Sequence, residues 1–273
     1  MDSRVPDLMR TAEALAREAG DLIRRGPERV DVAGTKSSAT DVVTAMDLAV
    51  ETLIRDRLRE LRPDDGVLGE EDGLQAGPSG LTWVVDPIDG TVNFLYGLPV
   101  YGVSIAVVQG RPDPGSWTQL AGCVHNVPDA TTWTAGSGAG AWQDGRRLPA
   151  MADRGLDGAL LGTGFGYRAD RRRTQGRVVS ALLPRVRDIR RIGAASVDLC
   201  LLAAGALDGH FERGLNPWDM AAGALLVTEV GGVVTGLRGN PAGEAMTVAG
   251  PPTLVAELCE ALEELGADAD TEP

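Results

Sequence analysis

Residues 83–94 read Trp83-Val84-Val85-Asp86-Pro87-Ile88-Asp89-Gly90-Thr91-Val92-Asn93-Phe94, and they combine a buried strand with two carboxylates. The apolar start predicts the strand, and Pro87 predicts that it ends at Asp86, because proline cannot donate to a sheet ladder. Gly90 and Thr91 then begin what reads as a short helix. Carboxylates at a strand end beside a helix N-terminus can hold a cation and a phosphate together. Taken alone, the stretch is explained equally well by a strand, a proline turn and an N-capping aspartate.

The length and net charge of the chain limit its domain organisation and the kind of partner that it can bind. Its 273 residues suit one large domain or two halves that share a core. The net charge of -13, from 26 basic and 39 acidic residues, argues against a protein built mainly to bind nucleic acid. It remains compatible with a small phosphorylated substrate, because a metal ion can supply local positive charge.

The cysteines and the N-terminus indicate the compartment. Cys123, Cys200 and Cys259 form no CxxC pair, which favours reduced thiols over a zinc site or a disulfide framework. The first 25 residues are rich in Arg, Asp and Glu and do not resemble a signal peptide. No apolar run approaches the roughly 20 residues of a membrane-spanning helix. We therefore expect a soluble, cytoplasmic protein that binds neither membranes nor nucleic acid.

The first half of the chain reads as two helices followed by a sheet. Apolar residues at helical spacing predict helices over 7–25 and from residue 47 to about residue 61. A short strand is expected at 30–32, a polar loop at 34–38, a short strand that ends in three acids at 66–72 and a connector at 73–80. Strands separated by short turns at 103–108, 120–124, 131–134 and 140–142 favour an antiparallel arrangement. The glycines of 136–140 fall within a hairpin, so they predict a turn and not a nucleotide-binding loop.

The second half alternates strands and helices. Strands are expected at 159–161, 187–191, 205–212, 233–234 and 246–249, and helices at 168–183, 193–203, 217–230 and 252–265. The glycine-rich residues 162–166 follow an apolar strand, and we expect them to line a cleft. The basic run 171–173 reads as a solvated face or a subunit contact. We predict a single domain over 1–273, with an N-terminal α+β half (about 7–150) and a C-terminal α/β half (about 151–265).

Acidic residues gather at the predicted ends of elements, beside Gly, Pro or Trp. They are Glu70, Asp86, Asp89 and Asp219, with Asp47 as a further candidate. A solvated loop would explain Glu70, and helix capping would explain Asp47. The two histidines, His125 and His210, lie in no catalytic constellation, so Ser-His-Asp or Cys-His chemistry is poorly supported. Oxygen ligands alone suit Mg²⁺, which would remove the repulsion among the carboxylates, activate a water and clamp a phosphoryl group.

Over about residues 8–265 the sequence resembles the inositol monophosphatase family of Mg²⁺-dependent, lithium-sensitive phosphatases. The motifs that carry the resemblance are residues 86–94, Trp218-Asp219-Met220-Ala221-Ala222-Gly223, Gly69-Glu70-Glu71, Asp41-Val42-Val43-Thr44-Ala45-Met46-Asp47 and Arg191-Ile192-Gly193-Ala194-Ala195-Ser196. The resemblance implies a layered αβαβα sandwich, an α+β and α/β fold. It also implies one catalytic domain, a homodimer and a cytoplasmic phosphoric monoester hydrolase.

The resemblance also implies roles for individual residues. Glu70, Asp86 and the Ile88 carbonyl would hold a first Mg²⁺, and Asp86, Asp89 and Asp219 a second, with a third, weaker ion near Glu70. Glu70 and Thr91 would position the attacking water, and Asp47 would hydrogen-bond Thr91. Backbone N–H groups of Gly90 and Thr91 would bind the phosphate. The alcohol portion of the substrate would face Gly193, Ala194, Ala195 and Glu212, and Lys36 would lie on a mobile loop near the metals.

Some positions depart from the family pattern and leave the substrate open. Val92 stands where a second threonine is common, and residues 96–99 and 164–167 differ near the rim of the pocket. We rank inositol phosphate or a similar polyol phosphate first, histidinol phosphate second and fructose 1,6-bisphosphate third. A binding or regulatory protein on the same fold is the alternative outside enzymes, and a dinucleotide-dependent oxidoreductase would rest only on the glycine-rich loops.

Overall fold

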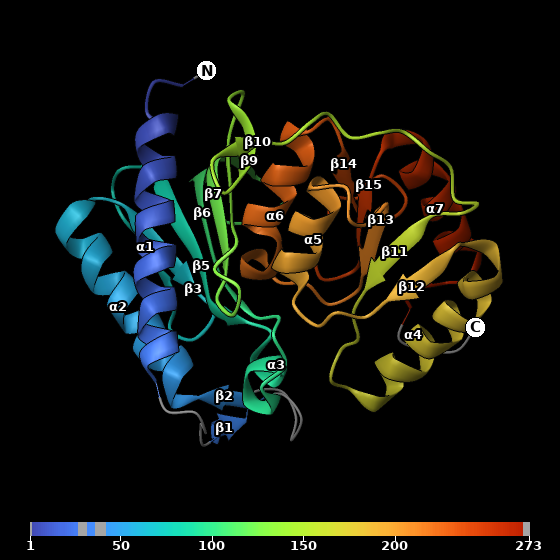
Figure 1. Cartoon of the computed structure of the whole chain (residues 1–273), viewed down its shortest axis with the longest axis horizontal. Helices are drawn as coiled ribbons and strands as arrows, with labels where there is room; N and C mark the ends of the chain where they lie inside the picture. The colour runs from blue at the N-terminus through green and yellow to red at the C-terminus, as the bar shows by residue number, and fades with distance from the viewer. Residues whose placement is uncertain (1, 27–31, 36–41, 270–273) are drawn as a thin grey trace.

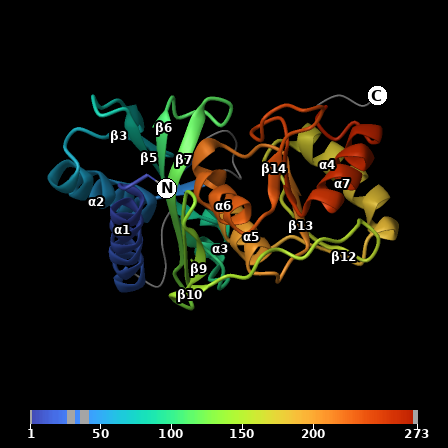
Figure 2. The same cartoon turned by 90° about the horizontal axis from the view of Figure 1, so that it is seen from above.

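A computed structural model describes residues 2–26, 32–35 and 42–269, which form alternating layers of helix and sheet (Figure 1). Helices α1 (Val5–Arg25) and α2 (Ala45–Leu61) make one outer layer and pack on the first sheet. Helices α5 (Ala195–Ala203) and α6 (Pro217–Glu229) separate the two sheets. Helices α4 (Ala169–Leu182) and α7 (Pro252–Glu264) cover the far face of the second sheet, as the view from above also shows (Figure 2). The predicted αβαβα sandwich is confirmed.

In the described chain the first sheet runs in the order β10-β9-β8-β7-β6-β5-β3-β4, and only β3 and β5 pair in parallel. Its strands are β3 (Gly66–Gly69), β4 (Gly73–Gln75), β5 (Leu81–Asp89), β6 (Gly102–Gly110), β7 (Trp117–Asn126), β8 (Thr132–Gly136), β9 (Gly140–Gln143) and β10 (Arg146–Arg147). Every residue of β5 is buried. Trp83 and Val85 face the core under α1 and α2, and Val84 faces the core under α5 and α6. This alternation follows from the pleat of a strand covered on both sides.

Strand β5 does not end at Asp86, so the prediction from Pro87 is wrong. The strand continues to Asp89, and its pairing with β6 shifts register between Asp86 and Asp89. A β-bulge is one of the places where a sheet accepts proline, because the ladder is already interrupted there. The bulge lies where the carboxylate motif begins. Gly90 then adopts a left-handed conformation (φ 89°) and starts α3 (Thr91–Tyr96), as predicted.

The second sheet runs β12-β11-β13-β15-β14, with β12, β11 and β13 parallel. It contains β11 (Leu160–Thr163), β12 (Asp188–Arg190), β13 (Gly209–Glu212), β14 (Val233–Thr235) and β15 (Thr247–Gly250), and a short 3-10 helix, η1 (Leu183–Arg185), follows α4. Strand β13 is shorter than predicted, because Gly205 (φ 80°) lies in a turn after α5. None of the described helices combines the length and the apolar character needed to cross a membrane.

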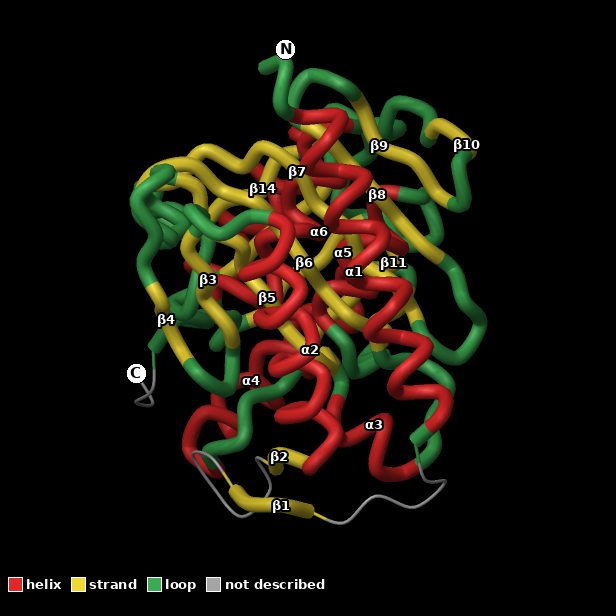
Figure 3. The backbone as a smooth tube through the Cα atoms, turned by 90° about the vertical axis from the view of Figure 1, so that its left-hand side faces the viewer, coloured by secondary structure: helices red, strands yellow, loops and turns green. Residues whose placement is uncertain are grey.

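Two segments predicted as irregular form strands. Residues 34–35 belong to β1 (Val32–Thr35), which pairs with β2 (Val42–Thr44) next to α3 at one end of the molecule (Figure 3). Residues 73–75 form β4, an edge strand that pairs antiparallel with β3. Short edge pairings of this kind leave little periodicity in the sequence, which explains why they were missed.

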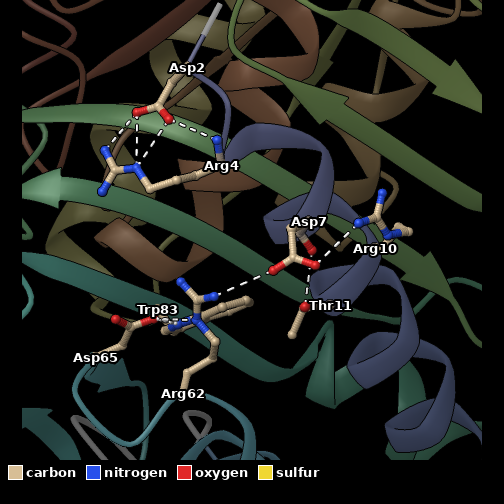
Figure 4. A network of polar contacts seen from close by, with 8 residues as sticks. All are labelled: Asp2, Arg4, Asp7, Arg10, Thr11, Arg62, Asp65 and Trp83. Atoms are coloured by element: carbon tan, nitrogen blue, oxygen red, sulfur yellow. Dashed lines mark hydrogen bonds and ion pairs between the residues drawn. The ribbon is translucent and has the colours of Figure 1, made fainter.

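Polar contacts fasten the first outer layer to the sheet beneath it (Figure 4). The buried Trp83 ring donates from Nε1 to Asp65 Oδ2 at 2.9 Å, and Arg62 Nε donates to the same oxygen at 2.9 Å. Arg62 also reaches Asp7 of α1 at 3.4 Å. These contacts join α1, the end of α2 and β5, so they hold the strand that leads to the bulge.

Helix α6 is fixed against the opposite face of the same sheet. Ser104 Oγ donates to the Trp218 carbonyl at 3.2 Å, and Gln119 Nε2 donates to the Ala221 carbonyl at 2.6 Å. A side chain at Gly122 would meet the Ala222 Cα at 3.0 Å, so a glycine lets the helix approach closely. The first turn of α6 is thereby held close to the end of β5.

Candidate active site

A cleft of about 460 Å³ lies where the ends of β5 and β13 meet the starts of α3, α5 and α6. It brings together nearly all the residues predicted from the sequence. Those that line it are Glu70, Asp86, Ile88, Asp89, Gly90, Thr91, Gly193, Ala194, Ala195, Glu212 and Asp219. Asp47 lies behind Thr91 and does not line the cleft, and Lys36 lies outside the described residues.

The bulge and the start of α3 fix one wall of the cleft. The Ile88 backbone N–H donates to Asp86 Oδ1 at 3.1 Å. Thr91 Oγ1 lies 3.0 Å from the Ile88 carbonyl and 3.3 Å from Asp47 Oδ1. Asp47 is fully buried and accepts the Thr44 backbone N–H at 2.8 Å in a capping box at the start of α2. The predicted contact between Asp47 and Thr91 is therefore present, and it ties Thr91 to a rigid helix end.

Glycines at two turns allow the walls of the cleft to approach each other. Gly90 has φ 89°, and a Cβ there would lie 3.1 Å from both the Ala194 Cβ and the Gly193 carbonyl. Gly193 has φ 105°, and a Cβ there would meet the Asn93 side chain at 2.8 Å. Asn93 joins the two loops, because its Nδ2 donates to the Val100 carbonyl at 2.8 Å and to the Ile192 carbonyl at 3.0 Å. Sequence analysis assigned no role to Asn93, although it lies inside the quoted motif.

The turn that carries Glu70 is held by a buried ion pair that the sequence did not reveal. Glu51 and Arg55 of α2 are buried and contact each other at 2.8 Å. Glu51 also accepts the backbone N–H groups of Glu71 at 2.9 Å and Asp72 at 3.0 Å, and Arg55 donates to the Gly73 carbonyl at 2.6 Å. At this spacing, four residues apart on a helix, such a pair reads as a solvated surface pair.

Two further carboxylates are held by helix starts. Asp89 accepts the Ser196 backbone N–H at 2.7 Å and the Ala195 N–H at 3.3 Å, both at the beginning of α5. Asp219, in the first turn of α6, accepts the Asn216 backbone N–H at 2.7 Å. Backbone donors at helix N-termini favour anionic partners, so the starts of α5 and α6 hold the Asp89 and Asp219 carboxyl groups in the cleft.

Burial and mutual repulsion dominate the electrostatics of this wall. Burial raises the pKa of Asp86 well above its ordinary value, and repulsion from Glu70, Asp89 and Asp219 adds to the effect. Burial also raises the pKa of Asp219, with Glu70 and Asp89 as the next causes. The pKa of Asp89 is raised by burial as well, although its hydrogen bonds from Ser196 oppose the shift. The protein thus concentrates acidic groups without supplying enough positive charge to balance them.

The opposite wall carries Glu212 and residues that sequence analysis did not select. Burial raises the pKa of Glu212 to about 8, with repulsion from Asp198 as the next cause. Asp198 of α5 and Arg191, which precedes α5, also line the cleft. The glycine-rich segment after β11 lines it too, as expected. Arg168 and Arg171, around the start of α4, complete the rim, so part of the basic run faces the cleft.

The donor set suits a hard cation. Glu70, Asp86, Asp89 and Asp219 line the cleft together with Ile88, and no cysteine or histidine is among its lining residues. Within the described residues, no three acidic, imidazole or thiol groups are already gathered as a formed metal site. The fit therefore rests on the oxygen donors and on Asp86 and Asp219. Burial first, and then repulsion among the carboxyl groups, raises the pKa of both, and a bound cation would relieve that repulsion.

The family model for the inositol monophosphatase family matches residues 6–267, so the chain belongs to that family of metal-dependent phosphomonoesterases. This confirms the family and the class of enzyme predicted from the sequence. Among its relatives, an "Inositol-1-monophosphatase" of Mycobacterium bovis is 43% identical, covering 96% of this chain and 95% of the relative. A protein of Escherichia coli K12 with the name "Nus factor SuhB" is 40% identical, covering 85% of this chain and 86% of its own.

Solved structures agree with the fold. The SuhB structure from Mycobacterium tuberculosis superposes with a TM-score of 0.80 at 40% identity, covering 98% of this chain and 100% of its own. The SuhB structure from Bartonella henselae gives 0.84 at 33% identity, covering 94% of this chain and 99% of its own.

Proposed function

We propose that the chain uses Mg²⁺ to hydrolyse a small phosphomonoester, with inositol monophosphate or a similar polyol phosphate as the preferred substrate. The observation that carries the proposal is the convergence of Glu70, Asp86, Asp89 and Asp219 on one cleft. The name of the mycobacterial relative supports the substrate class. Cleft residues come from both halves of the sequence, which supports a single catalytic domain over residues 1–273.

The carboxylates would divide the metal ions between them. Glu70, Asp86 and the Ile88 carbonyl would hold one Mg²⁺, and Asp86, Asp89 and Asp219 would hold a second, with a weaker third ion near Glu70. Bound Mg²⁺ lowers the pKa of a coordinated water and neutralises charge on a phosphoryl group. Asp86 belongs to both ligand sets, which agrees with its position between Glu70, Asp89 and Asp219 in the electrostatics of the cleft.

The protein's own groups would orient the water and the phosphate. Glu70, held by the Glu51–Arg55 pair through its neighbours, would accept a hydrogen bond from the attacking water. Thr91 would hold the same water from the other side, and Asp47 would keep the Thr91 hydroxyl in place. Backbone N–H groups of Gly90 and Thr91 would bind phosphate oxygens at the start of α3. Lys36 would add a positive charge from its loop.

The alcohol portion of the substrate would lie against small residues and one carboxyl group. Gly193, Ala194 and Ala195 leave room at the start of α5, and Glu212 faces them across the cleft. A carboxyl group can bind vicinal hydroxyls of a polyol, and it also fits the amino group of histidinol, so histidinol phosphate and fructose 1,6-bisphosphate stay as alternatives. We also propose that the protein acts as a homodimer.

A panel of phosphomonoesters, assayed with Mg²⁺ and again after chelation, tests the proposal. We expect phosphate release from inositol 1-phosphate that requires Mg²⁺, with slower release from histidinol phosphate and fructose 1,6-bisphosphate. Binding of these esters without turnover at any Mg²⁺ concentration would favour the alternative of a binding or regulatory protein. A higher kcat/KM on histidinol phosphate would keep the chemistry and change the substrate.

A further inference from the structure

A buried imidazole lies directly behind Glu212. His210 and Glu212 are two residues apart on β13 and therefore point to the same face of the second sheet. His210 is fully buried, with its Nε2 3.6 Å from Glu212 Oε2 and its Nδ1 3.9 Å from Asp198 Oδ2. Asp198 is 1% exposed and comes from α5, which packs on that face. The three side chains form a row from α5 to the cleft.

The row contains polar atoms that lack partners at hydrogen-bond distance. Within the described residues, three buried atoms of this row have no hydrogen-bond partner: Nδ1 and Nε2 of His210 and Oδ1 of Asp198. Buried polar groups left in this way cost about 1–3 kcal/mol each, and native structures keep few of them. A movement of less than about 1 Å would bring Nε2 and Oε2 within the roughly 3 Å of a hydrogen bond.

Two glycines on the neighbouring strand make room for this row. Gly162 pairs in register with His210, and a Cβ at Gly162 would lie 3.0 Å from His210 Nδ1. A Cβ at Gly164 would lie 2.0 Å from Glu212 Oε1. Gly162 within β11 and Gly164 directly after it therefore leave room for the imidazole and the carboxyl group.

We propose that Asp198 and His210 are positioning residues that hold the Glu212 carboxyl group toward the cleft, so that it selects substrates whose alcohol portion carries vicinal hydroxyls. This inference rests on the proposed phosphatase function. A neutral imidazole has one donor and one acceptor nitrogen. Burial raises the pKa of the Asp198 carboxyl group well above its ordinary value, which favours the protonated form. Asp198 then donates to Nδ1, and Nε2–H donates to Glu212.

His210→Leu tests the role, because leucine is close in size to histidine and makes no hydrogen bonds. We expect kcat/KM for inositol 1-phosphate to fall about tenfold, mainly through KM, which is the order expected for one lost hydrogen bond. For 4-nitrophenyl phosphate, which has no alcohol hydroxyls, kcat/KM should change less than about twofold. His210→Gln keeps a polar group facing Glu212. It should therefore restore most of the preference in kcat/KM for inositol 1-phosphate over 4-nitrophenyl phosphate.

The matched control is His125→Leu, which removes the only other histidine. His125 is also buried, but it lies on β7 with its Nδ1 2.8 Å from Thr132 Oγ1, away from the cleft. This variant should leave the ratio of the kcat/KM values for the two substrates unchanged. Equal losses on both substrates in His210→Leu, or no loss on either, would overturn the inference. If His210→Leu does not fold, Asp198→Ala, which removes the donor to Nδ1, decides by the same ratio of kcat/KM values.

Nitrogen NMR of the two histidines gives an independent reading, with His125→Leu supplying the assignment. We expect His210 to be neutral at pH 7, with its proton on Nε2. The Nδ1–H tautomer or a charged ring would contradict the proposed hydrogen bonds from Asp198 to His210 and from His210 to Glu212. The proposed function fails differently: if the unmodified protein hydrolyses neither ester with Mg²⁺, the phosphatase assignment is lost. Selective loss in His210→Leu can be seen only when that assignment holds.

Discussion

Glu51 and Asp86 are both buried carboxyl groups of the same half of the molecule, but different partners surround them. Glu51 contacts Arg55 at 2.8 Å and accepts two backbone N–H groups, so the protein itself satisfies it. Asp86 accepts one backbone N–H and faces Glu70, Asp89 and Asp219. A buried charge is tolerated when it is paired and hydrogen-bonded. Glu51 meets that condition within the fold, whereas the proposed function has Asp86 meet it through a bound cation.

The contrast separates carboxylates that build the scaffold from those that build the site. The structural pair fixes the turn that carries Glu70, and it is complete without a ligand. Burial, and after it mutual repulsion, raises the pKa of the cleft carboxyl groups Asp86 and Asp219, and shifts of this kind are typical of functional sites. Amide substitutions should therefore have opposite consequences in the two regions: loss of stability at Glu51 and loss of activity at Asp86.

The largest effect is expected for Asp86→Asn. The amide keeps the shape and can still accept the Ile88 N–H, but it loses the charge that would hold the cations. Several kcal/mol of metal-derived stabilisation should disappear, which corresponds to a fall in kcat of about a thousandfold or more. Steady-state assays at saturating Mg²⁺ measure it. Asp72→Asn, an exposed carboxylate beyond Glu70, is the control. Near-normal turnover of Asp86→Asn would remove the distinction between the two regions.

Glu51→Gln should produce the main loss of stability. It leaves Arg55 buried without its charge partner, which costs about 3–5 kcal/mol in the free energy of unfolding. Denaturant unfolding measures this loss. The matched control is Glu18→Gln, because Glu18 pairs with Arg57 at 2.7 Å on the exposed surface, where a pair contributes about 1 kcal/mol or less. Equal costs at the two positions would show that the buried pair has no special structural role.

A smaller effect concerns pH. Because the folded pKa of Glu212 is about 8, above its ordinary value of 4.5, the fold stabilises the protonated form. That contribution is complete below about pH 4.5 and is lost as the pH rises toward 8. Between pH 6.5 and 8.5 the metal-free protein should lose about 1 kcal/mol relative to Glu212→Gln, since part of the carboxyl group still contacts solvent. Parallel stability curves for the two proteins would contradict the raised pKa.

Local sequence patterns singled out the acidic wall of the cleft because its residues occur in short motifs at element ends. Residues 86–94 and the first turn of α6 place their carboxylates beside Gly, Pro or Trp, and the resemblance to the family then gave these residues their expected roles. The end of β5 was misread at Pro87, because a bulge depends on the partner strand β6. The strand β4 was missed for a related reason, since its pairing with β3 is all that makes it a strand.

The opposite wall depends on contacts between distant segments. Asp198, His210 and Gly162 come from a helix and two strands, and only their packing brings them together. The alternation of His210 with Glu212, beside that of Gly162 with Gly164, was the available signal. Glu51 and Arg55 were not singled out from the sequence, because helical spacing does not reveal what covers such a pair.

Unfolding of the metal-free protein and of Asp86→Asn, each with and without Mg²⁺, tests most directly whether the cleft carboxylates await a cation. Without metal, the variant should be at least as stable as the unmodified protein, because one repelling charge is gone. Mg²⁺ at about 100 times its Kd should stabilise the unmodified protein by about 2.7 kcal/mol and leave the variant unchanged. Lower stability of the metal-free variant, together with equal stabilisation of both proteins by Mg²⁺, would contradict this account.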